Sequence, residues 1–429
     1  MATVSVTELA QLTGCGVGDI AGLVELGIIS PSNGSFAKAD ISRVRLSLAL
    51  RDAGLDANVL ATAIADDLLS LDFAGQLMFD PVSLSVRGSE ELLASLDLDV
   101  ASATRLRSAV GLPALQPDQA LREDDIELMS LIAAARGFGL NDDALARVLR
   151  IFGQSVRRSV ETMRDLFRGE VEDRMLASGV SRRDMLERGA DMRLQLQRLG
   201  FRALFLLQRR MLEEAVFDNV VMRVQEILRE ARLGEALDRK PPTVAFIDLV
   251  GFTALTQAMG DERAADYASR LEALAQDTVS KHGGRLVKAL GDGVMLLFPD
   301  AMPALEASFA ISSRCADEGL PGVRAGLATG SVVPRDGDIF GATVNLAARI
   351  VAQVDPTQID IAHRDVAQAD HATPGQVLVC ADTREAIMAA WPEAFVFQPC
   401  PPVALKGVEK PVVLHAAWPR VLPATLAAS

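Results

Sequence analysis

The chain has 429 residues, 49% of them hydrophobic, and its 43 Lys and Arg against 57 Asp and Glu leave a formal net charge of −14. This length exceeds what one compact core holds and indicates two to three domains. The negative charge argues against general nucleic-acid binding, which uses clustered Lys and Arg. It does not exclude a phosphate substrate, because a bound divalent metal can invert the local field.

Three features indicate the cellular setting. The cysteines Cys15, Cys315, Cys380 and Cys400 are scattered without metal-type spacing, as in a reduced, cytosolic protein. Residues 1–30 lack the basic start and apolar block of a signal peptide. No apolar run reaches the ~20 residues that span a bilayer. We therefore expect a cytoplasmic protein, at most peripheral to the membrane, with no transmembrane segment.

The first helices are predicted to form a unit that occurs twice. Thr7 can cap one helix, and Asp40 can cap a longer helix that ends before Gly54. The recurring positions are Leu9, Ala10, Leu12, Gly27 and Ile28, matched 84 residues later, and Asp40, Ile41, Leu46, Ala49, Gly54, Leu55 and Leu60, matched 85 residues later. We predict a duplicated helical unit at roughly 5–64 and 89–149, packed as one helical domain because two copies are too few for a solenoid.

The first copy resembles the winged helix-turn-helix of MerR-type regulators, in VTELAQLTGCGVGDIAGLVELGII and ADISRVRLSLALRDAGL. That family's recognition helix carries basic and aromatic residues where this chain has Ala21 and Gly22, so we expect a shared fold without nucleic-acid contact. The second copy, through about Phe167, resembles the regulatory region ahead of the catalytic domain in many actinobacterial cyclases. We assign residues 1–70 and 71–200 to these two units.

A different helix is predicted over residues 201–233. Its apolar residues recur at alternating three- and four-residue steps, which is one stripe on a long helix. The stripe consists of Val216, Val220, Val224, Ile227 and Ala231. Two interpretations stay open, a core helix or a dimerising connector that transmits a signal. Pro241 and Pro242 mark the end of this connector region, residues 201–240.

From Thr243 the pattern changes to short buried strands. TVAFIDLV is followed by a Gly-Phe-Thr turn and a helix from about Asp261, and GGRLVKALGDGVMLLF predicts a hairpin. Asp248 then ends one strand and Asp292 lies at the hairpin tip. Two carboxylates on neighbouring strands can hold two divalent ions about 3.5–4 Å apart. The pair alone is weak evidence for a metal site, because aspartates often cap strands and turns.

The neighbouring motifs make this pair specific. FIDLVGFT, KALGDG and DIFGATVNLAAR occur in the order in which the class III nucleotidyl cyclases carry their first metal strand, their hairpin and their dimer-interface helix. Residues 241–420 closely resemble that family. The resemblance implies an α/β (α+β) catalytic domain with a ferredoxin-like βαββαβ core, preceded here by an all-α regulatory domain.

Carried over position by position, the resemblance implies where metals and base bind. Asp248 and Asp292 would hold two divalent ions, Mg²⁺ or Mn²⁺, with the Leu249 carbonyl as an extra ligand. Lys288 and Asp338 would read the base. Adenine offers an amino donor and a ring-nitrogen acceptor that match this pair, whereas guanine presents the opposite pattern. Guanylyl members carry Glu and Cys at these positions, so we expect ATP as the substrate.

The same resemblance implies contacts to the ribose and the phosphates. Asn345 would orient the ribose, and Arg349, four residues later on the same helix face, would stabilise charge on the transferring phosphorus. Further phosphate contacts are implied for Gly251, Phe252, Thr253, Arg324 and Lys406. For the last two a solvated surface role is the alternative.

The implied reaction is an in-line attack of the 3′-hydroxyl on the α-phosphorus that expels pyrophosphate, catalysed by positioning and charge stabilisation. The family's metal aspartates and its Asn–Arg helix lie on opposite sides of a head-to-tail pair, so a homodimer with two equivalent interfacial sites is expected. Two departures occur. The stretch 292–338 is short, as in the subgroup without a long dimer-clasping arm, and an insert occupies 351–373.

The sequence leaves alternatives to an adenylyl cyclase open. A guanylyl cyclase, or a weak homologue acting as a regulatory or DNA-binding protein, is the alternative. A diguanylate cyclase would carry a Gly-Gly-(Asp/Glu)-Glu-Phe hairpin, which is absent, and a silent homologue would have lost a metal Asp, the Asn or the Arg. The signal for the helical half stays open among protons, a small apolar or lipid ligand and a protein partner.

Overall fold

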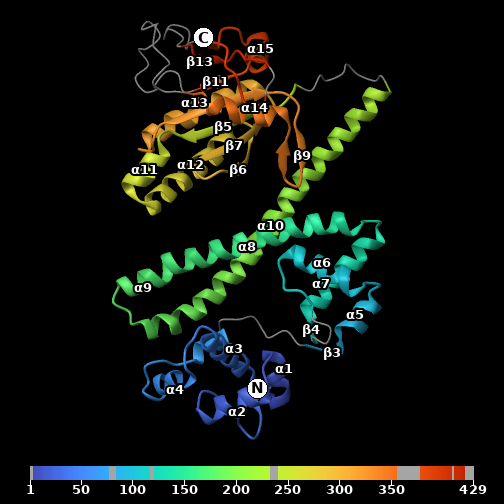
Figure 1. Ribbon diagram of the computed structural model, residues 1–429, viewed down its shortest axis with the longest axis vertical. Helices are drawn as coiled ribbons and strands as arrows, with labels where there is room; N and C mark the ends of the chain where they lie inside the picture. Colours follow the sequence, from blue (N-terminus) through green and yellow to red (C-terminus); the bar gives the residue numbers. More distant parts are fainter. Residues whose placement is uncertain are drawn as a thin grey trace. The chain divides into compact units, whose positions relative to one another are not determined.

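The computed structural model describes residues 3–76, 84–115, 120–231, 240–354, 377–407 and 410–420. The chain divides into two compact units, Met1–Gly234 and Glu235–Ser429 (Figure 1). Most of the predicted insert, from residue 355 on, lies outside the described residues. Within the described part of the chain, no helix combines the length and the apolarity that a bilayer span requires.

The N-terminal unit confirms the predicted duplication, because the same order of elements occurs twice (blue, then cyan, in Figure 1). The first copy contains β1 (Thr3–Val4), α1 (Val6–Thr13), α2 (Val17–Glu25), β2 (Phe36–Ala37), α3 (Lys38–Asp52) and α4 (Ala57–Ala65). The second contains β3 (Leu84–Gly88), α5 (Ser89–Ser95), α6 (Val100–Val110), β4 (Ala120–Arg122), α7 (Glu123–Gly137) and α8 (Asp142–Phe167). In each copy the two strands pair antiparallel, and each copy has its own apolar core.

The copies differ from the predicted alignment in their first helix. The amide of Cys15 bonds to the carbonyl of Ala10 after α1, and the amide of Leu98 bonds to the carbonyl of Leu93 after α5. These equivalent helix ends lie 83 residues apart rather than 84. From α3 and α7 onward the offset is 85, as predicted.

The first helix also begins earlier than predicted. Ser5, not Thr7, is the N-cap of α1, because its hydroxyl accepts from the Glu8 amide while the Glu8 carboxylate accepts from the Ser5 amide. This reciprocal capping box satisfies two amides that the first turn leaves unpaired.

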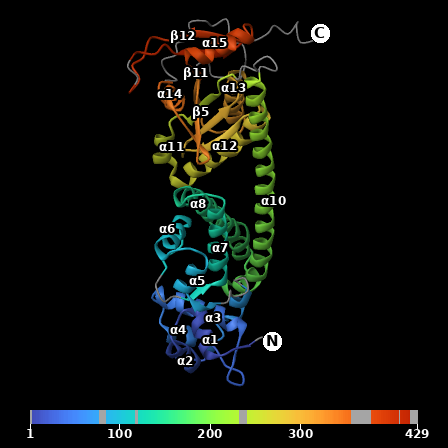
Figure 2. The same ribbon diagram turned by 90° about the vertical axis from the view of Figure 1, so that its right-hand side faces the viewer.

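After the second copy the chain folds back as a helical hairpin. A π-turn η2 (Arg168–Glu172) and α9 (Asp173–Ala177) lead to α10 (Arg182–Glu230), a single helix of 49 residues (Figure 2). Arg193 lies over the Phe167 ring and pairs with Glu172, which fixes the hairpin. At its start, α10 buries Ala190 in the core of the first copy.

The predicted apolar stripe lies on the second half of α10. The side chains of Val216, Val220, Val224 and Ile227 are 47–62% exposed. The core-helix interpretation is therefore wrong for a single chain, and the interpretation as a connector remains. The helix itself begins nearly twenty residues before the predicted start at 201.

The second unit is built around a seven-stranded sheet with strand order β12-β13-β11-β8-β5-β7-β6 (yellow to red in Figure 1). Its strands are β5 (Thr243–Leu249), β6 (Arg285–Ala289), β7 (Gly293–Phe298), β8 (Val323–Thr329), β11 (Val377–Val379), β12 (Phe395–Pro399) and β13 (His415–Pro419). Its helices are α11 (Phe252–Met259), α12 (Asp261–Lys281), α13 (Ala301–Asp317), α14 (Ala342–Val351) and α15 (Ala381–Ala390). The central strands follow the antiparallel order β8-β5-β7-β6, which confirms the ferredoxin-like core.

The two faces of strand β5 pack against different helices. Ile247 and Leu249 pack with α12 and α13 in the larger core. Val244 packs on the other face, with Ala347 of helix α14. Because side chains alternate along a strand, Asp248 lies on the same face as Val244. The sheet therefore presents this carboxylate on the side that α14 covers.

Helix α14 lies unusually close to strand β8. A Cβ added to Gly326 would lie 2.3 Å from the amide nitrogen of Val351 and 2.8 Å from the carbonyl oxygen of Ala347. Only a glycine at this position allows the helix to approach the sheet so closely. A short separate hairpin, β9 (Val333–Arg335) and β10 (Asp338–Phe340), leads into α14.

Candidate active site

The two aspartates meet at one end of the sheet, as predicted. Asp248 is paired with Gly293 in the β5–β7 ladder, and the amide of Leu249 donates to the carbonyl of Asp292 at 2.9 Å. A Cβ on Gly293 would lie 2.9 Å from the carbonyl oxygen of Ile247 and 3.0 Å from Oδ1 of Asp248. The glycine of the GDG turn therefore leaves the room that the Asp248 carboxylate occupies.

Arg324 lies directly against this carboxylate. It stands opposite Asp248 in the β5–β8 ladder, and its Nε and Nη2 donate to Oδ2 of Asp248 at 3.1 and 2.6 Å. Burial raises the pKa of the Asp248 carboxyl, the hydrogen bonds from Arg324 oppose that effect, and the charge of Asp292 adds to it. Arg324 is thus bound to Asp248 rather than surrounded by solvent alone.

The aspartate pair has the chemistry of a divalent-metal site that a substrate completes. Its donors are the carboxylates of Asp248 and Asp292, with the Leu249 carbonyl adjacent, and a cationic side chain already balances one carboxylate. Within the described ranges no group of three or more His, Cys, Asp or Glu gathers in one place. Mg²⁺ is commonly held by one or two carboxylates together with substrate phosphates, so this donor set fits Mg²⁺ or Mn²⁺ in the presence of a nucleotide.

A second pair forms beside the hairpin. Lys288 Nζ donates to Oδ2 of Asp338 at 2.5 Å, and the Ile339 amide donates to Oδ1 at 2.8 Å. Burial acts to raise the pKa of Asp338, but the hydrogen bonds from Lys288 and Ile339 outweigh it and lower that pKa. The side chains of Lys288 and Asp338 are 41% and 27% exposed, so an entering ligand can reach both. Lys288 presents N–H donors to such a ligand, and Asp338 presents carboxylate acceptors.

Helix α14 carries the remaining polar pair. Asn345 is exposed and Arg349 is half-buried one turn later. Gly407 has φ +75°, and a Cβ there would lie 3.3 Å from Nη2 of Arg349, so the turn that holds Lys406 lies beside this guanidinium. No hydrogen bond among the described residues joins either α14 side chain to the aspartates.

The predicted Gly-Phe-Thr turn is the start of a helix. Gly251 adopts φ +72° and precedes Phe252 and Thr253, the first residues of α11. The first amides of a helix have no intrahelical partner and attract anions. Sequence reasoning missed α11 because its helical stretch is only eight residues long and adjoins a second helix start at Asp261.

Comparison with known proteins identifies similar sequences and structures. Residues 28–212 match the sequence model described as the adenylate cyclase regulatory domain. Over 265 residues the chain is 32% identical to an adenylate cyclase of Streptomyces coelicolor, covering 61% of this chain and 66% of that protein. The chain is thus similar both to that regulatory domain and to an adenylate cyclase. It spans slightly less than two thirds of that relative's length.

Two further similarities accompany this match. A pH-sensitive adenylate cyclase of Mycobacterium tuberculosis is 28% identical over 321 residues, which cover 72% of each chain. The crystal structure of the adenylyl cyclase CyaB from P. aeruginosa aligns with 42% of this chain and 94% of its own, with a TM-score of 0.32 and 23% identity.

Proposed function

We propose that this chain is a class III adenylyl cyclase that converts ATP to 3′,5′-cyclic AMP and pyrophosphate at the interface of a homodimer, using two divalent ions, under the control of its N-terminal half. The observation that carries the proposal is the pairing at the sheet end. Asp248 and Asp292 meet at one end of the β5–β7 ladder, and Lys288 of the adjoining strand β6 pairs with Asp338 of β10, a pair whose chemistry matches adenine.

In this proposal Asp248, Asp292 and the Leu249 carbonyl hold Mg²⁺ or Mn²⁺. When bound, the ions supply Lewis-acid activation of the 3′-hydroxyl and neutralise the triphosphate. Arg324 can move its donors from Asp248 to phosphate oxygens, where charge-assisted hydrogen bonds are strong. Lys406 and the start of α11, at Gly251, Phe252 and Thr253, offer further donors to the same phosphates.

The base is read by the Lys288–Asp338 pair. ATP would separate the two side chains, so that Lys288 donates to a ring nitrogen of adenine and Asp338 accepts from its amino group. Guanine would place a donor opposite Lys288 and an acceptor opposite Asp338. A site with such unmatched buried polar groups strongly rejects the wrong base. Asn345 is proposed to orient the ribose, and Arg349 to stabilise charge at the α-phosphorus.

A second copy of the chain would complete the site. Within one chain the α14 side chains make no hydrogen bond to the aspartates among the described residues, so a partner is proposed to bring its own Asn345 and Arg349 to them. The exposed apolar stripe on α10, from Val216 to Ile227, supports a dimer because a stripe of this kind requires a covering surface.

Regulation is assigned to the region before Pro241. We keep the division into two helical units over 1–70 and 71–200, a connector over 201–240 and a catalytic domain over 241–420. Protons are a reasonable signal to test, since the Mycobacterium tuberculosis relative is named as pH-sensitive. We propose a cytoplasmic protein without nucleic-acid contacts.

The decisive experiment is a product assay on the purified full-length chain. With Mn²⁺ and ATP it should form cyclic AMP, and with GTP at the same concentration far less cyclic GMP. Cyclic GMP as the main product would indicate a guanylyl cyclase instead. If neither nucleotide gave product above an Asp292→Ala control, the chain would be a regulatory homologue without activity.

A further inference from the structure

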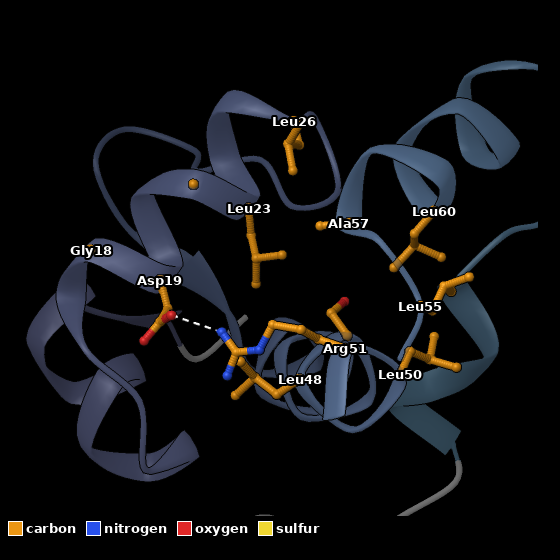
Figure 3. Close-up of a pocket in the computed structure, with 12 residues that line it drawn as sticks. Gly18, Asp19, Leu23, Leu26, Leu48, Leu50, Arg51, Leu55, Ala57 and Leu60 are labelled. Atoms are coloured by element: carbon orange, nitrogen blue, oxygen red, sulfur yellow. Dashed lines mark hydrogen bonds and ion pairs between the residues drawn. The ribbon is translucent and has the colours of Figure 1, made fainter. Parts of the chain in front are cut away.

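The first helical copy contains a cavity of about 240 Å³ between α2, α3 and α4 (Figure 3). Half of the twelve residues that line it are leucines: Leu23, Leu26, Leu48, Leu50, Leu55 and Leu60. At its edge Arg51 Nη1 and Asp19 Oδ1 form an ion pair at 2.9 Å, drawn as a dashed line in Figure 3. The cavity therefore has an apolar wall and one polar edge.

The internal duplication explains part of this space. Ser47 lines the cavity on α3 and is 5% exposed, with its hydroxyl bonded to the carbonyl of Arg43 in its own helix. At the offset of 85 that relates α3 to α7, its equivalent is Ile132, which is 4% exposed in the core of the second copy. The second copy thus fills with an isoleucine a position where the first has only a hydroxyl.

Size and charge define what the cavity can hold. Its volume corresponds to about eight water molecules at about 30 Å³ each, or a molecule of roughly seven to ten non-hydrogen atoms. Asp19 and Arg51 already neutralise each other, so a charged ligand would have to break this pair to find a counterion. An apolar molecule with one neutral polar group meets both the leucine wall and the polar edge.

The cavity is mechanically connected to the long helix. Arg43 of α3 bonds to Asp72 of the 3₁₀ turn η1 (Asp72–Gln76) at 2.5 Å. At the start of α10, Arg183 pairs with Asp67 at 2.7 Å, and Ala190 packs in the same core as Leu23 and Leu60. The element that seats α10 therefore shares its core with the cavity wall.

We propose that this cavity is an effector site for a small uncharged apolar molecule, such as a cyclic or branched alcohol, whose binding tightens the seat of α10 at residues 182–190. Occupying the cavity adds contacts to α3 and α4 and lowers the freedom of the core on which α10 rests. Its consequence for catalysis rests on the proposed cyclase function, but binding itself does not.

The test uses the full-length chain and cyclohexanol as the probe, with cyclohexanecarboxylate and cyclohexylamine as charged counterparts of similar size. Dissociation constants come from NMR titration. Cyclohexanol should bind saturably, and each charged probe at least about tenfold more weakly. Hydrogen exchange of the amides of residues 182–190 should slow at least about threefold when cyclohexanol is saturating.

Variants localise the site. Ser47→Ile copies the second repeat and should weaken cyclohexanol binding at least about tenfold, whereas Ser47→Ala, which keeps the space, should not. Ala49→Ile is the matched control, since this exposed position is on the same helix but outside the cavity wall. Gly22→Leu fills the cavity from α2, where an added Cβ meets no atom within 4 Å, and covers the case in which Ser47→Ile misfolds.

Three results would overturn the proposal. These are no saturable binding by the unmodified chain, unchanged binding in both folded cavity-filling variants, or equal affinity for the charged probes. Because none of these readouts involves cyclic AMP, a chain that binds cyclohexanol but lacks cyclase activity would contradict the proposed function and leave the effector site standing. The reverse result would remove the effector site alone.

Discussion

Nη2 of Arg324 lies 2.6 Å from Oδ2 of Asp248, and Nε of the same guanidinium lies 3.1 Å from the same oxygen. A carboxylate proposed to bind metal is thus held by a cation from the neighbouring strand. In the proposed function, binding of metal and nucleotide would displace or redirect this arginine. We therefore expect Arg324 to connect metal affinity with phosphate binding.

Arg324→Ala should separate these two effects. We expect the rate at saturating ATP to fall about 10²-fold, because one donor to developing phosphate charge is lost. At the same time, the Mn²⁺ concentration for half-maximal activity should fall, because the competing cation is gone. Steady-state kinetics over a Mn²⁺ series measures both. Arg263→Ala, at an exposed position on α12, should change neither, and a rise in the Mn²⁺ requirement of Arg324→Ala would contradict the competition.

A composite site predicts complementation. Asp248→Ala and Arg349→Ala chains should each lose more than about 95% of the activity, since each removes a group that acts at both sites of its homodimer. After mixing and subunit exchange, one site in each heterodimer contains every residue again, and activity should return toward a quarter of the unmodified level. Light scattering should show dimers throughout. Confirmed exchange without recovery would rule out the interfacial arrangement.

The base-reading pair predicts a change in specificity. Lys288→Glu combined with Asp338→Cys reverses donors and acceptors, so the ratio of cyclic GMP to cyclic AMP formed should rise at least about 100-fold. Competition between the two nucleotides at equal concentration measures this ratio directly. The single variant Lys288→Glu, which leaves two acidic side chains in contact, is expected to be nearly inactive with both. An unchanged ratio in the double variant would mean that other residues read the base.

The close approach of α14 predicts a positioning role for Gly326. Gly326→Ala forces the helix away from β8, because its Cβ would lie 2.3 Å from the Val351 amide nitrogen. We expect a loss of about 1–3 kcal/mol in the free energy of unfolding and a fall in kcat of at least about tenfold. Urea unfolding and kinetics measure these. Gly322→Ala, at an exposed position directly before the same strand, provides the comparison; a stable Gly326→Ala chain with full kcat would disprove the role.

Removing the N-terminal half should alter control without abolishing activity. A chain beginning near Arg202 keeps the striped half of α10 but loses residues 182–190, which seat the helix in the first copy. We expect activity to rise, because a single incorrect docking of the N-terminal helices is enough to keep the two catalytic domains from assembling their sites. A shift of about 1–3 kcal/mol would change the rate roughly 5- to 150-fold. Identical pH–rate profiles for both chains would show that the removed half does not regulate.

The elements with local signals could be predicted from the sequence. Short apolar runs and a turn predict the β5 strand and the hairpin around Gly291. The observed hairpin strands differ from the prediction by about one residue. The duplicated unit was visible because apolar positions recur. The exact offset between the first helices of the two copies could not be predicted. Leu92 and Leu93 are both leucine and both buried, so either could be matched to Leu9.

Contacts between distant residues could not be predicted. Arg324 and Asp248 are 76 residues apart, and only the pairing of β5 with β8 places them face to face. The role of Gly326 likewise depends on where α14 lies, which no pattern within its own strand encodes. The extension of α10 back to Arg182 was missed because the expected helix was defined by its exposed stripe, whereas its first turns are held by the first copy.

The two helical copies also have a consequence for folding. Each relies on a very short ladder, such as Thr3 with Ala37 in the first copy, to close a loop of more than thirty residues. Because the second copy presents the same order of elements, β1 of the nascent chain can meet β4 as well as β2. Tandem units of this kind are prone to misassembled traps. Synthesis from the N-terminus lessens that hazard, since the first copy can close before the second has been made.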